Sequence, residues 1–337
     1  MEFDFTAEQL ALRDLARDLF EKESPPSRLR ELWEGAERDA SCWRAMAAVG
    51  LTGLTIEEKH GGMGGTDVDL ALVLEETGRA ALPEPLLETV AVAAPLLAEA
   101  GTDDQRAEWL PKIAAGDAVA TVAFTGWPFV VDAGEADLLI AETQAGELHA
   151  LPRGAFGATK VESEDRARRV YSVELRPTAA TLMPGDTARA RLRAAVGAAG
   201  ILNGISTKLL DMTLAHVKAR NQFGRPVGSF QAVKHKLADA HVLVESARAA
   251  TWYAAYALAS AGPDAALSAS VAKSYASDAA AAANRAALQA HGGIGFTWEH
   301  DLHLWLKRGK ALEQAYGSAS EHRRRIATSL FEERDGA

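Results

Sequence analysis

Residues 220–231 read RNQFGRPVGSFQ, and residues 289–296 read QAHGGIGF. In both stretches a helical pattern gives way to a turn that is rich in glycine or contains proline. The guanidinium group of Arg220 can hold two phosphate oxygens at once, which a lysine cannot do. Phe223 offers an aromatic plane in the same turn, and the glycines allow a bulky ligand to approach the backbone closely. The two stretches therefore predict a site for a ligand that carries both phosphates and rings.

The composition is that of an acidic globular chain. Its 337 residues are 48% hydrophobic, and the formal net charge is −10. This charge argues against nucleic acid or an anionic membrane as a partner. Cys42 is the only cysteine, so no disulfide can form within the chain, and a reducing cytoplasm is expected. The first residues lack the pattern of a signal peptide, and no apolar run approaches the roughly 20 residues that span a bilayer.

The periodicity of apolar residues divides the chain into three expected domains. Residues 1–116 are helical, beginning with the capping-box pattern of Thr6 and Gln9. Residues 117–185 form a small β domain, and residues 186–337 return to long helices joined by short breaks.

Within the middle domain, short runs rich in branched residues alternate with Gly, Pro and charged residues. These runs predict strands at residues 118–124, 137–141, 147–151 and 170–173. The last helix is expected to run unbroken from residue 298 to residue 331. Glu313 and Glu321 would then lie on one helix face, on either side of Gly317.

This order of elements and the two stretches quoted first resemble the acyl-CoA dehydrogenase family. Residues 5–9 and the glycine-rich residues 57–65 are also similar to that family. The resemblance implies a mainly α fold: a helical N-terminal domain, a β-barrel-like middle domain and a C-terminal four-helix bundle. It also implies FAD as the cofactor. In the family, the two stretches contact an FAD that a neighbouring subunit mainly holds.

Carried over to this sequence, the resemblance assigns the following flavin contacts: Arg220, Gln222, Phe223, Phe230, Gln231, Gln289, Gly292 and Gly293. For any one of these residues, a purely structural role is the simpler interpretation. The combination favours the flavin site.

The residues that would hold the chain's own FAD have no clear counterpart. The family's Thr-Glu-Pro and Gly-Ser-Asp segment corresponds to residues 124–134, where only Thr125 remains recognisable.

The catalytic base is missing as well. The base removes a proton next to the thioester, which requires a carboxylate. Gly317 occupies the family's usual Glu position, and Ala194 lies near the alternative position on an earlier helix. Glu313 and Glu321 are possible substitutes, but Glu321 is followed by basic residues, which favours a surface ion pair.

We therefore expect a chain that resembles the degenerate, base-lacking subunit of heterotetrameric actinobacterial acyl-CoA dehydrogenases, some of which act on steroid side chains. Its partners would be a homologous subunit that carries the catalytic Glu, in an α2β2 tetramer, an acyl-CoA substrate and an electron-transfer flavoprotein. Two alternatives remain open. One is a self-sufficient homotetramer with a displaced Glu base, and the other is a flavin-free structural subunit.

Overall fold

The chain begins with helices packed into a shared core. A computed structural model describes residues 4–335, and within them no helix is both long and apolar enough to cross a membrane. The N-terminal helices are α1 (Ala7–Glu23), α2 (Pro26–Trp33), α3 (Ser41–Ala48), α4 (Asp67–Arg79), the π-helical η3 (Leu87–Ala93), α5 (Ala94–Ala100) and α6 (Asp103–Ala114), with the 3₁₀ turns η1 (Leu51–Gly53) and η2 (Glu58–His60). The capping box expected at Thr6 and Gln9 is confirmed.

Two small sheets follow. The first has the strand order β1 (Ala120–Ala123), β3 (Leu138–Glu142), β4 (Leu148–Pro152) and β7 (Leu182–Met183), and the second has the order β2 (Val130–Val131), β6 (Val170–Leu175) and β5 (Phe156–Val161), with the 3₁₀ turn η4 (Ala179–Thr181) before β7. β1 and β3 are parallel, and the other pairs are antiparallel. The four strands expected from the sequence are confirmed as β1, β3, β4 and β6.

The expectation of a barrel-like middle domain is wrong, because the two sheets do not close on each other. β2 has only two residues and pairs with β6 alone, so no backbone ladder joins the sheets. They pack through a small apolar cluster and through the hydroxyl of Thr121, which donates to the carbonyl of Val131 at 2.7 Å. The middle region therefore has no barrel interior; the first sheet instead packs against the helices.

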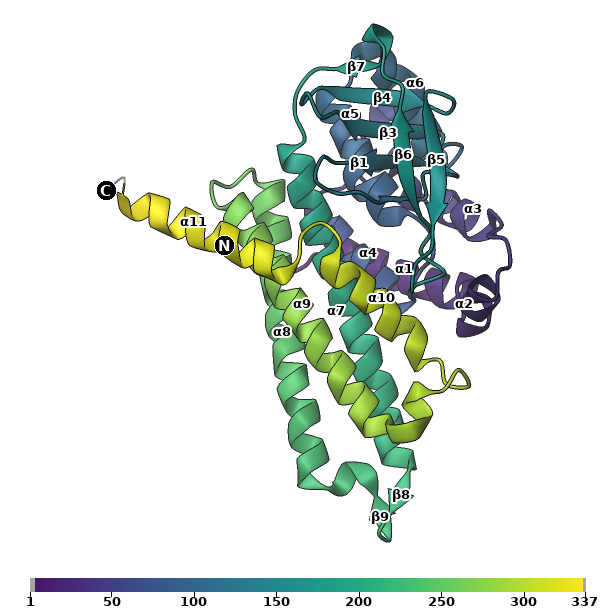
Figure 1. Ribbon diagram of the computed structural model, residues 1–337, viewed down its shortest axis with the longest axis vertical. Coiled ribbons are helices and arrows are strands. Elements are labelled where there is room, and N and C mark those ends of the chain that lie inside the picture. The colour runs from purple at the N-terminus through teal and green to yellow at the C-terminus, as the bar shows by residue number, and fades with distance from the viewer. Residues whose placement is uncertain (1–3, 336–337) are drawn as a thin grey trace.

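The C-terminal part is a helical bundle with an extended tail (Figure 1). It consists of α7 (Ala188–Ala219), the hairpin strands β8 (Asn221–Gln222) and β9 (Arg225–Pro226), η5 (Val227–Ser229), α8 (Gln231–Ala259), α9 (Ala265–His291), η6 (Gly292–Phe296), α10 (Leu302–Gln314) and α11 (Ala319–Asp335). α9 packs against α7 and α8, and α10 packs against α7. Division of the chain into three domains at the expected boundaries remains a prediction.

The long final helix expected from the sequence is interrupted. α10 ends at Gln314 and α11 begins at Ala319, since Tyr316 and Gly317 both adopt positive φ angles of 58° and 102°. The chain changes direction there, and α11 projects away from the bundle (Figure 1). Glu313 and Glu321 therefore belong to different helices and share no face.

Candidate functional site

The first sequence stretch forms a hairpin at the far end of the bundle. α7 ends where the amide of Arg220 donates to the carbonyl of His216 at 2.9 Å, and the amide of Val227 returns to the carbonyl of Arg220 at 2.8 Å. Between these bonds, Gln222 pairs with Arg225 across the two short strands. Arg220, Gln222 and Arg225 are all exposed. The hairpin thus presents several polar side chains beyond the last turn of α7.

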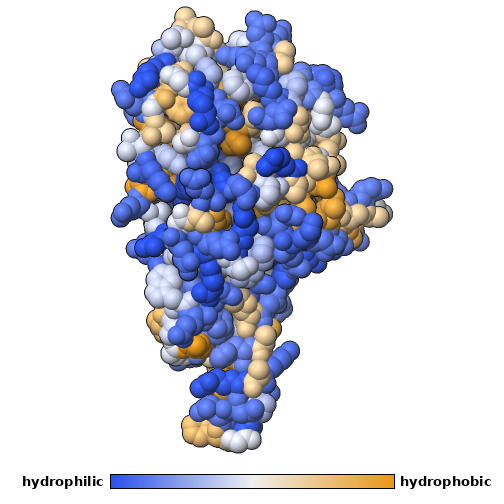
Figure 2. All heavy atoms as spheres, turned by 90° about the vertical axis from the view of Figure 1, so that its right-hand side faces the viewer, coloured by the Kyte–Doolittle hydropathy of each residue, from blue (hydrophilic) through white to orange (hydrophobic). Residues whose placement is uncertain are grey.

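Phe223 lies at the tip of this hairpin in a strained conformation. Its φ angle is +52°, a region that bulky residues rarely adopt, and its side chain is 92% exposed. Its ring makes an edge-on contact with Phe230 at 6.2 Å between centroids, and Arg225 lies over Phe230 at 4.1 Å. Figure 2 shows apolar atoms at this narrow lower end of the molecule. Strain and exposure together favour a role for Phe223 outside its own chain.

The second stretch lies beside the first. His216, in the last turn of α7, stacks on His291, the last residue of α9, with ring centroids 4.3 Å apart. Arg220 follows His216 by one helical turn, and Gly292 follows His291 directly. Burial lowers the pKa of both histidines, and the nearby His300 acts in the same direction, as does Arg220 for His216. The two motifs are therefore held together by a stacked imidazole pair, in which His291 is buried and His216 is half-buried.

The glycine loop exposes its backbone. Gly292 has a φ of +62°, and a Cβ added at Gly292 or Gly293 would meet no atom within 4 Å. Gln289, one turn earlier on α9, is exposed as well. A phosphate group could reach the backbone here without displacing any side chain of this chain. The residues present thus fit a pyrophosphate that arrives from outside.

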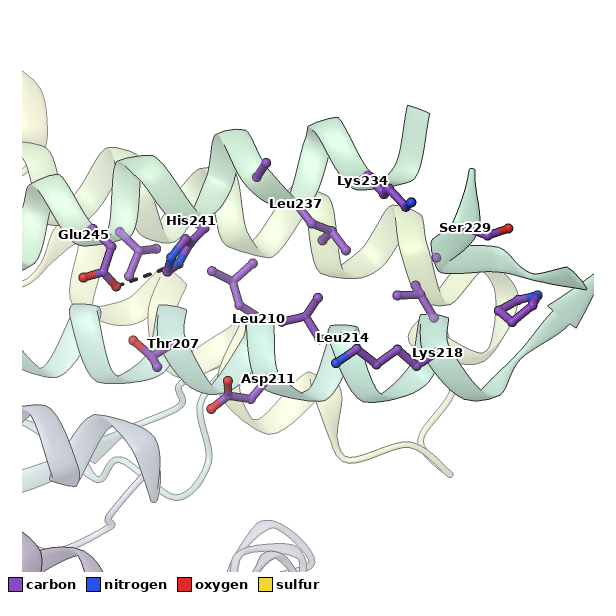
Figure 3. A pocket seen from close by; sticks show the side chains of 15 residues that line it. Thr207, Leu210, Asp211, Leu214, Lys218, Ser229, Lys234, Leu237, His241 and Glu245 are labelled. Carbon is purple, nitrogen blue, oxygen red and sulfur yellow. Dashed lines mark ion pairs between the residues drawn. The ribbon is translucent and has the colours of Figure 1, made fainter. Parts of the chain in front are cut away.

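An apolar groove continues from the hairpin along α7 and α8. It has a volume of about 620 Å³, and Pro226, Gly228 and Ser229 of the hairpin region form one end of it. Leu210 and Leu214 from α7 face Leu237 from α8 along its floor (Figure 3). The charged rim is formed by Asp211, Lys218, Lys234, His241 and Glu245.

A second cavity of about 630 Å³ surrounds the expected base position. It lies between the end of β1, the start of α7, the start of α9 and the turn that joins α10 to α11. Among its lining residues are Trp127, Arg191, Gly317 and Glu321. We refer to it as the 317 cavity.

Gly317 cannot carry a side chain in this conformation. Its φ of +102° disfavours any other residue, and an added Cβ would lie 2.7 Å from Nε2 of His322. His322 is almost fully buried, with Nε2 3.1 Å from the carbonyl oxygen of Tyr316 and Nδ1 3.3 Å from the hydroxyl of Ser270. Burial lowers the pKa of His322 to about 4. The imidazole fills the space that a side chain at position 317 would need.

Sequence reasoning missed Lys273, which also holds this turn. Its buried ammonium donates to the carbonyl of Gly317 at 2.9 Å and to the carbonyl of Glu313 at 3.2 Å. Burial lowers the pKa of Lys273 to about 7, against the attraction of Glu313 and Glu321. The sequence did offer an indication of this role, because Lys273 is the one lysine in residues 265–283, which are mostly alanine and serine.

Neither candidate carboxylate is well placed as a base. Glu313 is buried, pairs with Lys310 at 2.8 Å, and is not among the residues that line the 317 cavity. Glu321 does line the cavity, but it accepts hydrogen bonds from the amide and hydroxyl of Ser318 at 2.7 and 2.8 Å. These bonds lower the pKa of Glu321. The main contact of Glu321 is therefore with Ser318, so that its carboxylate caps α11, while Arg324 and Arg325 also attract it.

Thr125, the one residue of residues 124–134 that remains recognisable from the family's flavin-binding segment, already forms hydrogen bonds within the chain. The amide and hydroxyl of Thr125 donate to Glu142 at 3.1 and 2.6 Å. Arg191 contacts both Thr125 and Glu142, and although burial opposes it, these hydrogen bonds lower the pKa of Glu142. The 317 cavity therefore does not fit a flavin of its own, because the Thr125 donors have another partner.

Charged groups lie behind Tyr316, which lines the 317 cavity. The hydroxyl of Tyr316 donates to Glu88 of η3 at 2.7 Å, and Arg168 approaches the same carboxylate at 3.6 Å. Trp127 stacks against Tyr316 with ring centroids 6.2 Å apart. An acyl chain extending inward would have to displace an ion-paired carboxylate, which is unfavourable in a buried site.

The sequence and the fold agree with one family. Residues 6–117 match the acyl-CoA dehydrogenase N-terminal domain, and residues 181–331 match the acyl-CoA dehydrogenase C-terminal domain. Acyl-CoA dehydrogenase IpdE2 of Mycolicibacterium smegmatis is 37% identical over 326 residues, covering 96% of this chain and 99% of the relative. The chain belongs to the acyl-CoA dehydrogenase family.

Two solved structures of this family are similar over almost the whole chain. The ChsE4–ChsE5 complex from Mycobacterium tuberculosis has a TM-score of 0.90 and 26% identity, and it covers 98% of this chain and 99% of that chain. The Tcur3481–Tcur3483 steroid acyl-CoA dehydrogenase variant has a TM-score of 0.87 and 28% identity, with the same coverage. The resemblance to heteromeric actinobacterial acyl-CoA dehydrogenases is thereby confirmed.

Proposed function

We propose that this chain is the base-lacking subunit of a heteromeric acyl-CoA dehydrogenase. The observation that carries the proposal is the contrast between the two ends of the chain. The hairpin and the glycine loop are exposed, and side chains of their own chain do not cover them. In the 317 cavity, by contrast, His322 fills the space beside the base position, and Thr125 already donates to Glu142. The exposed end is thus accessible to a ligand bound by a neighbouring subunit, whereas the 317 cavity has neither a free base position nor free Thr125 donors.

In this proposal the exposed end holds part of an FAD bound mainly by the partner. Arg220 and the exposed backbone of the glycine loop would hold the pyrophosphate, and the aromatic tip would pack beside the ring system. Gln222, Phe230, Gln231 and Gln289 complete the set. When bound, FAD supplies the two-electron oxidation that forms the α,β double bond of an acyl-CoA.

The partner is a homologous subunit that carries the catalytic Glu. We place it against the groove between α7 and α8, because that groove adjoins the hairpin and combines an aliphatic floor with a rim of both charges (Figure 3). An α2β2 tetramer with one FAD per pair of chains follows. The Tcur3481–Tcur3483 relative, which is named as a steroid acyl-CoA dehydrogenase, supports a steroid CoA thioester as the substrate. An electron-transfer flavoprotein as acceptor and a cytoplasmic location complete the proposal.

Co-expression with a homologous partner tests the proposal. The complex should contain about one FAD per two chains, while this chain expressed alone should be colourless or poorly soluble. A yellow, active oligomer of this chain alone, with one FAD per chain, would contradict the proposal.

One observation keeps a second function open. Glu321 lines the 317 cavity, so a homotetramer that uses Glu321 as a displaced base is the competing hypothesis. Its hydrogen bonds to Ser318 and its lowered pKa argue against it, since a general base needs a pKa near the operating pH.

A further inference from the structure

A third cavity, of about 770 Å³, lies where all three parts of the chain meet. Its walls are the end of α2, the connection from β5 to β6, and the start of α10 with the loop that precedes it. We refer to it as the Trp298 cavity. None of its lining residues belongs to the hairpin, the glycine loop or the 317 cavity.

Trp298 is exposed and yet firmly held. Its side chain is 60% exposed, but its carbonyl accepts a hydrogen bond from Arg30 at 2.5 Å. The same guanidinium donates to the carbonyl of Glu299 at 2.9 Å and to the carboxylate of Asp301 at 2.5 Å. Three bonds from one arginine thus fix a loop whose main exposed feature is an indole ring. Such preorganisation is expected of a ring that receives a ligand.

A second aromatic ring and an ammonium group complete this wall. Trp33 lies 5.9 Å from Trp298 between ring centroids, and His303 lies 4.7 Å from Trp298. Lys307 is placed over both indoles, at 5.2 Å from Trp33 and 5.0 Å from Trp298. Cation–π contacts of this kind hold the rings in place. The result is an aromatic surface at the edge of a cavity.

The remaining walls carry an excess of positive charge. Five cations line the cavity, namely Lys160, Arg166, Arg168, Arg169 and Lys307, against three carboxylates, namely Glu34, Glu162 and Glu164. This local excess contrasts with the net charge of −10 for the whole chain.

Two of these cations form no ion pair in the described part of the chain, although Arg166 attracts the nearby Glu164. Lys307 pairs with Glu164 at 2.9 Å, while Arg168 and Arg169 pair with carboxylates outside the cavity. Lys160 and Arg166 are exposed, and neither forms an ion pair with any residue that the structure describes. They are available to an anion.

We propose that the Trp298 cavity binds an adenine nucleotide. The base would stack on the indole of Trp298, a contact that every purine ring can make. The phosphates would pair with Arg166 and Lys160, because guanidinium and ammonium groups form charge-assisted hydrogen bonds with phosphate oxygens. The same chemistry is offered by a free nucleoside diphosphate and by the nucleotide end of coenzyme A. The proposal does not depend on the flavin site, which consists of other residues.

Binding is measured on the FAD-loaded complex, by tryptophan fluorescence and calorimetry, with four probes: ADP, adenosine 3′,5′-bisphosphate, adenosine and inorganic phosphate. We expect both nucleotides to bind more tightly than adenosine or inorganic phosphate. Tighter binding of the 3′,5′-bisphosphate than of ADP would identify coenzyme A as the source, and the reverse order would identify a free nucleotide.

Variants place the binding at this cavity. Trp298→Ala and Arg166→Glu should each weaken nucleotide binding by about tenfold or more, since stacking and charged hydrogen bonds each contribute on that scale. Trp298→Phe should retain most of it. Arg176→Glu, an exposed cation after β6 at the opposite end of the same sheet, is the matched control and should leave binding unchanged.

Three outcomes would overturn the proposal: no binding of either nucleotide, unchanged binding in both Trp298→Ala and Arg166→Glu, or inorganic phosphate binding as tightly as the nucleotides. Arg220→Ala separates this proposal from the flavin proposal, because it should lower FAD content and leave nucleotide binding at the Trp298 cavity intact.

Discussion

At the scale of single residues, the contact between Gly317 and His322 decides what the 317 cavity can do. One substitution could restore a carboxylate at this family base position if the space beside it were free. Here the space is filled by a buried imidazole, and the backbone has a conformation that disfavours every other residue.

Replacing Gly317 by Glu should therefore destabilise the chain without creating a base. We expect a loss of roughly 1–3 kcal/mol in the free energy of unfolding, from backbone strain and the clash with His322. Gly317→Ala should give a similar loss, because the conflict begins at Cβ. Denaturant unfolding measures it, and a Gly317→Glu protein that is both stable and newly active would refute this account.

Glu313 and Glu321 should be bystanders in catalysis. Changing either to Gln should alter anaerobic flavin reduction of the complex by less than about threefold, whereas loss of a true general base lowers rates by roughly 10²–10⁴-fold. FAD content serves as the control. A hundredfold loss in Glu321→Gln with full FAD content would favour the self-sufficient enzyme.

Arg220 should contribute directly to FAD affinity. Arg220→Ala removes a charged hydrogen-bond donor worth roughly 1.5–3 kcal/mol, which corresponds to about a ten- to hundredfold weaker FAD complex. Arg220→Lys should restore only part of the affinity, since it lacks the planar fork. Equilibrium titration of the reconstituted complex measures this, and an unchanged FAD affinity in Arg220→Ala would show that the hairpin was assigned wrongly.

At the scale of elements, the hairpin of β8 and β9 keeps a strained aromatic residue in solvent. Phe223→Gly should relieve the positive φ angle, so the isolated chain should be as stable as before or more stable. The complex should be weakened by about tenfold, because an exposed aromatic anchor is lost. Leu182→Ala, an exposed apolar residue of β7, is the control. Equal complex affinity for Phe223→Gly and the parent chain would rule out a contact role for the tip.

Sequence patterns predicted those helices and strands whose formation depends on residues close together in the sequence. The capping box of Thr6 and Gln9 and four of the strands depend on residues close in sequence, and the structure confirms them. The small β domain expected in the middle is present, but it is not barrel-like, because sheet closure depends on pairing between distant strands and β2 is too short to bridge them.

The break after α10 depends on contacts that the sequence does not display. The turn at Tyr316 and Gly317 is held by Lys273, which lies some 40 residues earlier, and by His322. The role of Glu321 was available locally, since a Ser followed three residues later by Glu is a capping pattern. The identities of the flavin-contact residues came from the family resemblance and remain predictions.

At the scale of the whole molecule, buried histidines couple stability to pH. His322 has a folded pKa of about 4, below its ordinary value of about 6.5, so the unfolded chain binds its proton first as the pH falls. This contribution is fully present above pH 6.5 and is lost between about pH 6.5 and 4. Glu84 opposes it, because burial raises the pKa of Glu84 to about 7 and favours the protonated folded state on acidification.

A comparison of variants isolates the histidine. His322→Gln removes one titrating group, so its unfolding free energy should fall less steeply with acid than that of the parent chain, by about 1.4 kcal/mol per pH unit at most. Unfolding is measured from pH 7 to pH 4.5. His60→Gln, on the exposed turn η2, gives a control profile. Parallel profiles for His322→Gln and the parent chain would contradict the coupling.

The pairing of Gly317 with His322 also bears on descent. If this chain is the base-lacking subunit proposed above, no single substitution returns it to a self-sufficient enzyme, because residue 317, the imidazole of His322 and the turn would all have to change together. A side chain added at position 317 alone would meet His322 and a disfavoured backbone conformation. In the proposed heteromeric enzyme, dependence on a second gene would then persist because the way back is blocked, whether or not the complex brings a benefit.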